Sequence, residues 1–145
     1  MTRAGQVTAT AVPFVWLGMV LAISFLETPL KFRAPGITVP LGLGIGRLVF
    51  RALNAAELML AGLLIVAGFA GTLPTIAWVL VVGVCALLSL QVLVLRPRLD
   101  RRADQIIAGE VPAPSHQHLL YIAMETVKLL ALPVLGAVVA TQVLS

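Results

Sequence analysis

Long apolar runs separated by two polar connections dominate this chain of 145 residues. A helix that crosses the hydrocarbon core of a bilayer needs roughly 20 mostly apolar residues in a row. Runs of that length occupy about residues 11–30, 43–71, 76–95 and 118–144. The pattern predicts an all-α fold, a four-helix transmembrane bundle, in a polytopic integral membrane protein that forms a single domain.

Prolines and glycines are expected to set the ends of these spans. The residue before a proline disfavours helix, so Pro29 should end the first span and Arg96-Pro97 the third. A tight turn over residues 71–75 makes the second and third spans an antiparallel hairpin. Residues 98–109 mix arginines with aspartates, which predicts a short, solvated surface helix. No small-residue cleavage site follows the first run, so we interpret it as a retained transmembrane helix.

Composition supports the membrane class. Of all residues, 60% are hydrophobic and 11% are charged, with a mean hydropathy of +1.07. Soluble domains are about half apolar and about a quarter charged. The formal net charge of +4 does not indicate nucleic-acid binding, because the basic residues flank apolar spans, where they set topology and meet anionic lipid. The lone Cys85 excludes an intramolecular disulfide.

The basic residues are unevenly distributed between the two sides of the predicted bundle. Two connections, 31–42 and 96–117, carry most of them, whereas the other side has only Arg3. The positive-inside rule then predicts that both connections are cytoplasmic and both termini lie on the non-cytoplasmic side of the cell or inner membrane. The basic residues in or beside these connections are Lys31, Arg33, Arg47, Arg51, Arg96, Arg98, Arg101 and Arg102.

Ionisable residues within the apolar runs give the candidate site. A charge in hydrocarbon costs at least about 2.5 to 3.5 kcal/mol, so it normally faces a partner, a cavity or a substrate. Residues three and four apart share a helix face, and this spacing gives one polar stripe on each of the first, second and fourth spans. All three stripes lie near the predicted cytoplasmic end, with Glu57 and Glu125 roughly 8 to 10 Å inside the boundary. The predicted ligand-binding residues of this shared pocket are Glu27, Lys31, Arg47, Arg51, Asn54, Glu57, His118, Tyr121, Glu125 and Lys128.

The same charges also have a structural interpretation. Polar residues act as contacts between membrane helices, at about 0.6 to 2 kcal/mol each. Three helices that present ionisable groups at one depth favour a functional pocket for the constellation as a whole. Its glutamates are outnumbered by basic residues by one, which suits a small anion or an anionic headgroup. A single protonated glutamate would change that balance.

The sequence predicts no catalytic residue, no metal site and no cofactor. His116 and His118 are two residues apart, so they point in different directions on a helix and do not make a metal pair. The glycines at 42, 44 and 46 lack the Lys-Ser/Thr ending of a phosphate loop. Nucleophile elbows and dinucleotide fingerprints are absent from the sequence, so nothing argues for an enzyme.

Two short motifs resemble a known family. The stretch SFLETPLKFRAP at residues 24–35, followed by GIGRLVFRALNAAE at residues 44–57, is similar to the transmembrane protein 205-like domain family. The resemblance implies a four-helix membrane protein, sometimes linked to export or resistance, and supplies no reaction. It covers the first half of the chain, and the second half matches in layout. The pattern positions carried over are Pro29, Phe32, Gly46, Arg47, Phe50 and Asn54.

Two functional hypotheses follow. The first is a membrane protein that binds or transports a small ion or solute in the charged pocket, most easily as a homo-oligomer, because four helices enclose little volume. The second is an accessory or assembly subunit of a larger membrane complex, with the polar stripes serving docking. The expected partners are therefore the lipid bilayer, with a small anion or ion, and further membrane chains.

Overall fold

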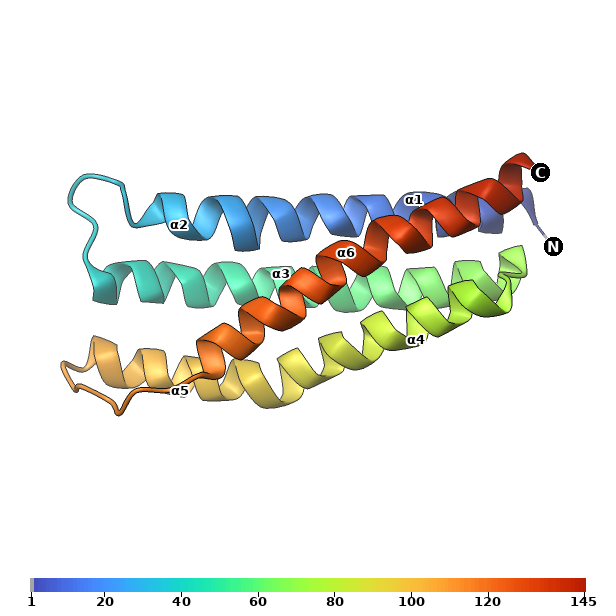
Figure 1. Cartoon of the computed structure of the whole chain (residues 1–145). Helices are drawn as coiled ribbons and strands as arrows, with labels where there is room; N and C mark the ends of the chain where they lie inside the picture. The colour runs from blue at the N-terminus through green and yellow to red at the C-terminus, as the bar shows by residue number, and fades with distance from the viewer. Residues whose placement is uncertain (1) are drawn as a thin grey trace.

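The computed structural model describes residues 2–145 and consists of four long helical rods in an antiparallel bundle (Figure 1). The first rod comprises α1 (Arg3–Val20), a π-helical segment η1 (Leu21–Glu27) and α2 (Thr28–Lys31). The second is α3 (Val39–Gly71). The predicted all-α four-helix bundle is confirmed.

The second half of the chain supplies the other two rods. The third comprises α4 (Thr75–Leu90), the π-helical segment η2 (Gln91–Leu95) and α5 (Arg96–Ile107), and the fourth is α6 (Gln117–Leu144). Between α3 and α4, Thr72 adopts a left-handed conformation (φ 52°) and its N–H donates to the Gly68 carbonyl. This cap closes the tight turn that was predicted between the second and third spans.

The first rod ends at Lys31, two residues past Pro29, close to the predicted end, whereas Pro97 does not end the third rod as the sequence suggested. Each π-helical segment ends two residues before a proline, Pro29 or Pro97, and the rod then continues as α-helix. Thr28 N–H donates to the Ile23 carbonyl and Arg96 N–H to that of Gln91, each five residues back. A proline ring clashes with the carbonyl four residues earlier in an α-helix, and the wider π turn offers the chain another path. The surface helix predicted at residues 98–109 is therefore α5, a continuation of the third rod.

The fourth rod, α6, lies obliquely across the other three (Figure 1). α1 packs against α3 and α6, and α4 packs against α6. Both termini lie at one end of the bundle and α2 and α5 at the other, called here the α2–α5 end. The half of the bundle nearer the termini contains the main apolar core, with fully buried side chains that include Trp16, Leu64, Leu88, Leu132 and Leu135.

A close backbone contact joins α1 to α3 near the termini. A Cβ atom built on Gly5 would lie 2.7 Å from the Gly71 nitrogen and 2.9 Å from the Ala70 carbonyl carbon. Thr2 N–H donates to the Ala70 carbonyl at 2.8 Å in the same place. Only residues without a side chain let two helix backbones approach this closely, which is a frequent device in membrane helix packing.

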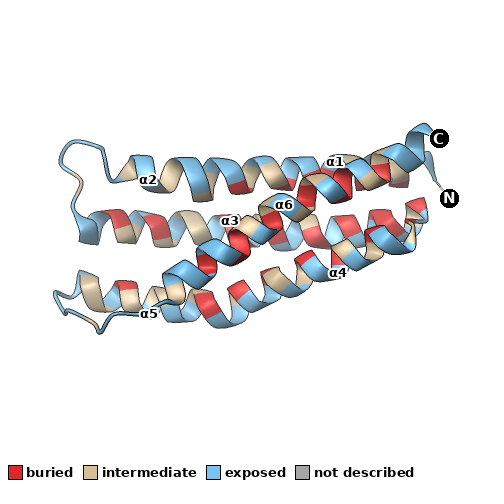
Figure 2. Ribbon diagram, in the orientation of Figure 1, coloured by how far each residue is buried: buried red, intermediate tan, exposed pale blue. Residues whose placement is uncertain are grey.

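The outer faces of the rods are strongly apolar. Met59, Phe69 and Leu93 are each more than 70% exposed, and exposed residues cover the outside of every rod while buried ones form inward stripes (Figure 2). Apolar surface on this scale is not stable in water and requires a cover. Each rod has the length and hydropathy of a membrane span. The chain is thus an integral membrane protein with four candidate transmembrane helices.

Candidate functional site

A triad of charged side chains lies in the interior of the bundle. Lys128 Nζ of α6 lies 2.6 Å from Glu57 Oε2 of α3 and 2.7 Å from Glu125 Oε1 of α6. Glu57 and Lys128 are 0% exposed and Glu125 is 1% exposed. One ammonium group contacts both carboxylates, so the three side chains lie at one level of the bundle. Fully desolvated charges of this kind require partners with good geometry.

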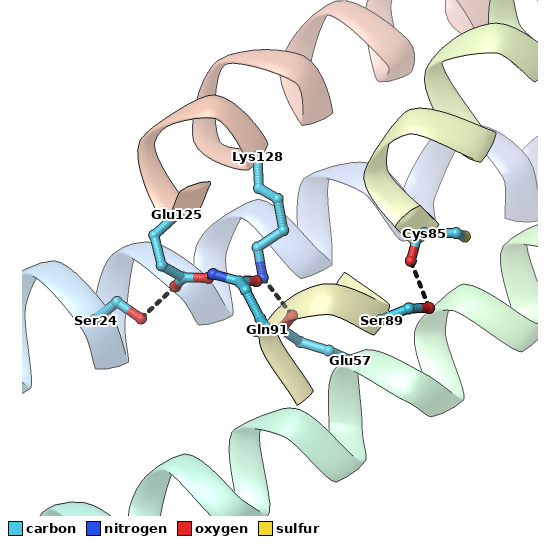
Figure 3. Close-up of polar contacts among 7 residues, drawn as sticks. All are labelled: Ser24, Glu57, Cys85, Ser89, Gln91, Glu125 and Lys128. Atoms are coloured by element: carbon cyan, nitrogen blue, oxygen red, sulfur yellow. Dashed lines mark hydrogen bonds and ion pairs between the residues drawn. The ribbon is translucent and has the colours of Figure 1, made fainter. Parts of the chain in front are cut away.

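The two π-helical segments contribute one hydrogen-bond donor each to the same carboxylate. Ser24 Oγ of η1 donates to Glu125 Oε2 at 2.6 Å, and Gln91 Nε2 of η2 donates to Glu125 Oε1 at 2.9 Å. All four rods therefore meet at the triad (Figure 3). π-Helical turns often mark functional sites in membrane and soluble helices. In this protein the segments η1 and η2 turn Ser24 and Gln91 towards the triad.

The charges of the triad do not balance. Two carboxylates face one ammonium group, so the triad carries one negative charge when every member is ionised. Three acceptor oxygens of the cluster are also buried without a hydrogen-bond donor among residues 2–145: Asn54 Oδ1, Glu57 Oε1 and Gln91 Oε1. Buried polar groups normally have a hydrogen-bond partner, so three acceptors without a donor are unusual.

A cavity of about 610 Å³ lies at the α2–α5 end and reaches Glu125. Its walls are largely apolar and include Phe25, Phe32, Phe50 and Ile106. Small-molecule sites in proteins have this size and this mixture of apolar walls with few charged groups. Four basic residues and two acidic ones contribute to its lining: Lys31, Arg47, Arg96, Arg102, Asp100 and Glu125.

Arg96 is the most unusual residue of the cavity. Its guanidinium carbon lies 4.5 Å from the ring centroids of both Phe50 and Tyr121, which themselves stack edge to face. The side chain is only 14% exposed, and its nearest carboxylate, Asp100, is 3.9 Å away. Cation–π contacts with two rings restrain the guanidinium. Its edge carries N–H groups suited to a planar anion.

Most of the predicted site residues come together in the structure. The triad contains three of them, and Glu125 also lines the cavity. The predicted residues that line the cavity are Lys31, Arg47, His118, Tyr121 and Glu125. The shared polar region is therefore two connected parts, a buried triad and an open cavity, with Glu125 in both.

The remaining predicted residues take different places. Asn54 is buried one turn before Glu57 on α3, and Glu27 is half-buried with Oε1 3.7 Å from Lys31 Nζ. Arg51 is exposed and lies outside both the triad and the cavity lining. Arg47, which also lines the cavity, is paired with Asp104 of α5. Arg47 and Arg51 therefore do not neutralise the carboxylates of the triad.

Three side chains of the candidate site are missing from the ten predicted residues. Ser24 and Gln91 are not among the ten predicted residues, and Arg96 was assigned to a cytoplasmic connection. A signal existed for Gln91, because a lone amide in an apolar run needs a partner. Arg96 could not have been found in this way, since its role depends on the third rod continuing past Pro97. Ser89, by contrast, donates to the Cys85 carbonyl of its own helix and does not join the triad (Figure 3).

The fold and the site define a four-span integral membrane protein with a buried Glu57–Lys128–Glu125 triad. No protein-family model, curated protein or solved structure matches the chain.

Proposed function

We propose that this protein binds a small anion with an apolar body, such as a short-chain carboxylate, in the cavity at the α2–α5 end. The observation that carries the proposal is Arg96, a guanidinium held against two aromatic rings and lining the cavity. Its only carboxylate neighbour within 4 Å among the described residues is Asp100, at 3.9 Å. A cation held in this way is pre-organised for an incoming anion, because little side-chain entropy is lost on binding.

The other charges of the cavity support an anionic ligand. The Lys31 side chain is 6% exposed and has Glu27 as its acidic neighbour, at 3.7 Å. Basic residues of the lining outnumber acidic ones by four to two. The apolar walls favour a ligand that also carries a hydrocarbon part. Inorganic anions match the charges alone, so they serve as a comparison in the test.

The proposal extends to topology and to family. The basic residues concentrate at the α2–α5 end, which supports a cytoplasmic location for that end and a non-cytoplasmic one for the termini. Membership of the transmembrane protein 205-like domain family is part of the same proposal. Of the six pattern positions, all but Asn54 line the cavity, which supports a common binding region.

The test is equilibrium binding to the full chain in lipid nanodiscs, by calorimetry, with hexanoate and inorganic phosphate as probes. Hexanoate should bind, and Arg96→Gln should weaken binding by about tenfold or more, because a hydrogen bond to a charged group is worth about 1.5 to 3 kcal/mol. Arg33→Gln is the matched control, since Arg33 is exposed and does not line the cavity. Equal hexanoate binding by all three proteins, or none by any of them, contradicts the proposal.

A second candidate function is an accessory subunit of a larger membrane complex. The triad supports it, because salt bridges and hydrogen bonds that join all four rods are also what a rigid docking unit requires. In that case the isolated protein should copurify with other polypeptides from its own membrane. A homo-oligomer that carries a small molecule favours the binding protein instead.

A further inference from the structure

The unbalanced charge of the triad has a consequence beyond the binding cavity. With all members ionised, the triad would hold one net negative charge in the membrane interior. An unpaired charge in such surroundings costs several kcal/mol and is normally neutralised. Candidate metal sites of three or more His, Cys, Asp or Glu are absent among residues 2–145. The Lys128 ammonium group would also repel a metal cation. The simplest neutralising species is one proton.

The hydrogen bonds distinguish the two glutamates. Glu125 accepts from three donors: Ser24 Oγ, Gln91 Nε2 and Lys128 Nζ. Glu57 accepts from Lys128 through Oε2, and the Trp16 indole N–H is a second donor beside this carboxylate, whereas Glu57 Oε1 has no complete hydrogen bond among the described residues. Donors stabilise the ionised form of a carboxylate, so Glu125 is the ionised member. A proton on Glu57 Oε1 would turn an unpaired acceptor into a donor.

Suitable acceptors for that proton belong to the same buried cluster. Asn54 Oδ1 lies one turn away on α3, and Gln91 Oε1 belongs to the amide that already contacts Glu125. Both oxygens are buried and lack donors among residues 2–145. A single proton therefore removes the excess charge and supplies a donor for one of these two oxygens.

We infer that the triad is a proton-binding site, with one exchangeable proton on Glu57 and with Glu125 and Lys128 ionised. The charged groups that face Glu57 are Lys128 and Glu125 of α6, and the neutral Trp16 indole of α1 lies beside it. Ser24 of η1 and Gln91 of η2 contribute neutral donors to Glu125. The next ionisable neighbours are Tyr121 and Arg96.

Glu125 connects this proton to the cavity, because it belongs to the triad and also lines the cavity wall. An anion that enters the cavity repels the Glu125 carboxylate and thereby favours uptake of a second proton by the triad. This coupling rests on the proposed function, whereas the resident proton does not. By linkage, proton uptake must then strengthen anion binding by the same factor.

Infrared spectroscopy of the full chain in nanodiscs at neutral pH tests the inference, because protonated carboxyl groups absorb apart from ionised ones. The wild type should show one protonated carboxyl per chain, since the exposed acids are ionised at that pH. Glu57→Gln and Glu125→Gln should each show none, because one carboxylate then balances Lys128. Glu110→Gln, at an exposed loop position, is the control and should keep the signal.

Two further variants sharpen the test. Lys128→Met should raise the number to two, since both carboxyls must then be neutral. Ser24→Ala removes a donor from the ionised Glu125 only, so the count should stay at one and the band of the protonated Glu57 carboxyl should keep its position. A wild-type protein with no protonated carboxyl, or a signal that survives in Glu57→Gln and Glu125→Gln, overturns the inference.

Adding hexanoate separates this inference from the proposed function. A rise from one protonated carboxyl towards two supports the coupling. Hexanoate that binds without changing the count overturns the coupling alone, and a missing wild-type signal overturns the proton site whether or not hexanoate binds. Failure of hexanoate to bind, with the wild-type signal present, leaves the proton site standing and contradicts the proposed function.

Discussion

Lys128 Nζ lies 2.6 Å from Glu57 Oε2, so one ion pair joins the middle of α6 to the middle of α3 with both side chains fully buried. The two residues are 71 positions apart in the sequence. Because Lys128 also contacts Glu125, this pair aligns the polar side chains of two rods at a single depth. It is the contact from which the triad and the inner end of the cavity are built.

Removal of Lys128 should be the most damaging substitution in the triad. Lys128→Met leaves two buried carboxyl groups without their cation, and breaking a buried pair by deleting one partner costs about 3 to 5 kcal/mol. We expect a large fall in the thermal unfolding temperature in mild detergent. The double variant Lys128→Met, Glu57→Gln should recover part of that stability. A double variant no more stable than the single one would show that the pair is not coupled.

Ser24 and Ser89 provide a matched pair of hydroxyl deletions. Ser24→Ala removes a hydrogen bond to the charged Glu125 and should cost about 1 to 2 kcal/mol, since Ser24 is only partly buried. Ser89→Ala removes a bond to the carbonyl of its own helix on an exposed face and should change stability by less than about 0.5 kcal/mol. Detergent-induced unfolding curves measure both, and equal losses would argue against a special role for Ser24.

Gly5 and Gly18 test the backbone contact between α1 and α3. Gly5→Ala would place a methyl group 2.7 Å from the Gly71 nitrogen, and backbone cannot easily move aside. We expect a loss of about 1 to 3 kcal/mol, typical of overpacking. Gly18→Ala on the same helix meets nothing within 4 Å and should be neutral or slightly stabilising. The comparison is read from thermal unfolding of both variants, and an undiminished Gly5→Ala protein would exclude tight packing there.

Topology can be tested with single cysteines in a Cys85→Ala background. Arg33→Cys lies beside α2, and Ser145→Cys lies at the opposite end of the bundle. If the α2–α5 end is cytoplasmic, a membrane-impermeant thiol reagent added to intact cells should label Ser145→Cys and should label Arg33→Cys only after the cells are opened. The reverse labelling pattern would invert the proposed orientation.

The class of fold was predictable from the sequence because lipid-exposed helices must be apolar along their whole length. Three of the four stripe residues on α6 proved to be inward because a helix face is set by spacing alone. His118, the fourth, is exposed at the beginning of α6, where it borders the cavity. Helical spacing thus located the polar face without revealing its partners.

The parts that could not be predicted depend on the path of the chain past its prolines. Local preference at Pro29 and Pro97 favours a helix end, but the π-helical segments before them carry the rods further. The wider turns of η1 and η2 bring Ser24 and Gln91 to Glu125. The continuation of the third rod past Pro97 places Arg96 against Phe50 and Tyr121. Pairings between distant rods, such as Arg47 with Asp104, likewise have no local signature.

The most direct measurement for the binding cavity is native mass spectrometry of the protein extracted under mild conditions from its own membrane, beside Arg96→Gln and Arg33→Gln. We predict a homo-oligomer that carries a reproducible small acidic mass in the wild type and in Arg33→Gln, and that loses it in Arg96→Gln. A wild-type protein that carries no small mass would contradict the proposed function. A protein found only in assemblies with other polypeptides would contradict it as well and would favour the accessory subunit.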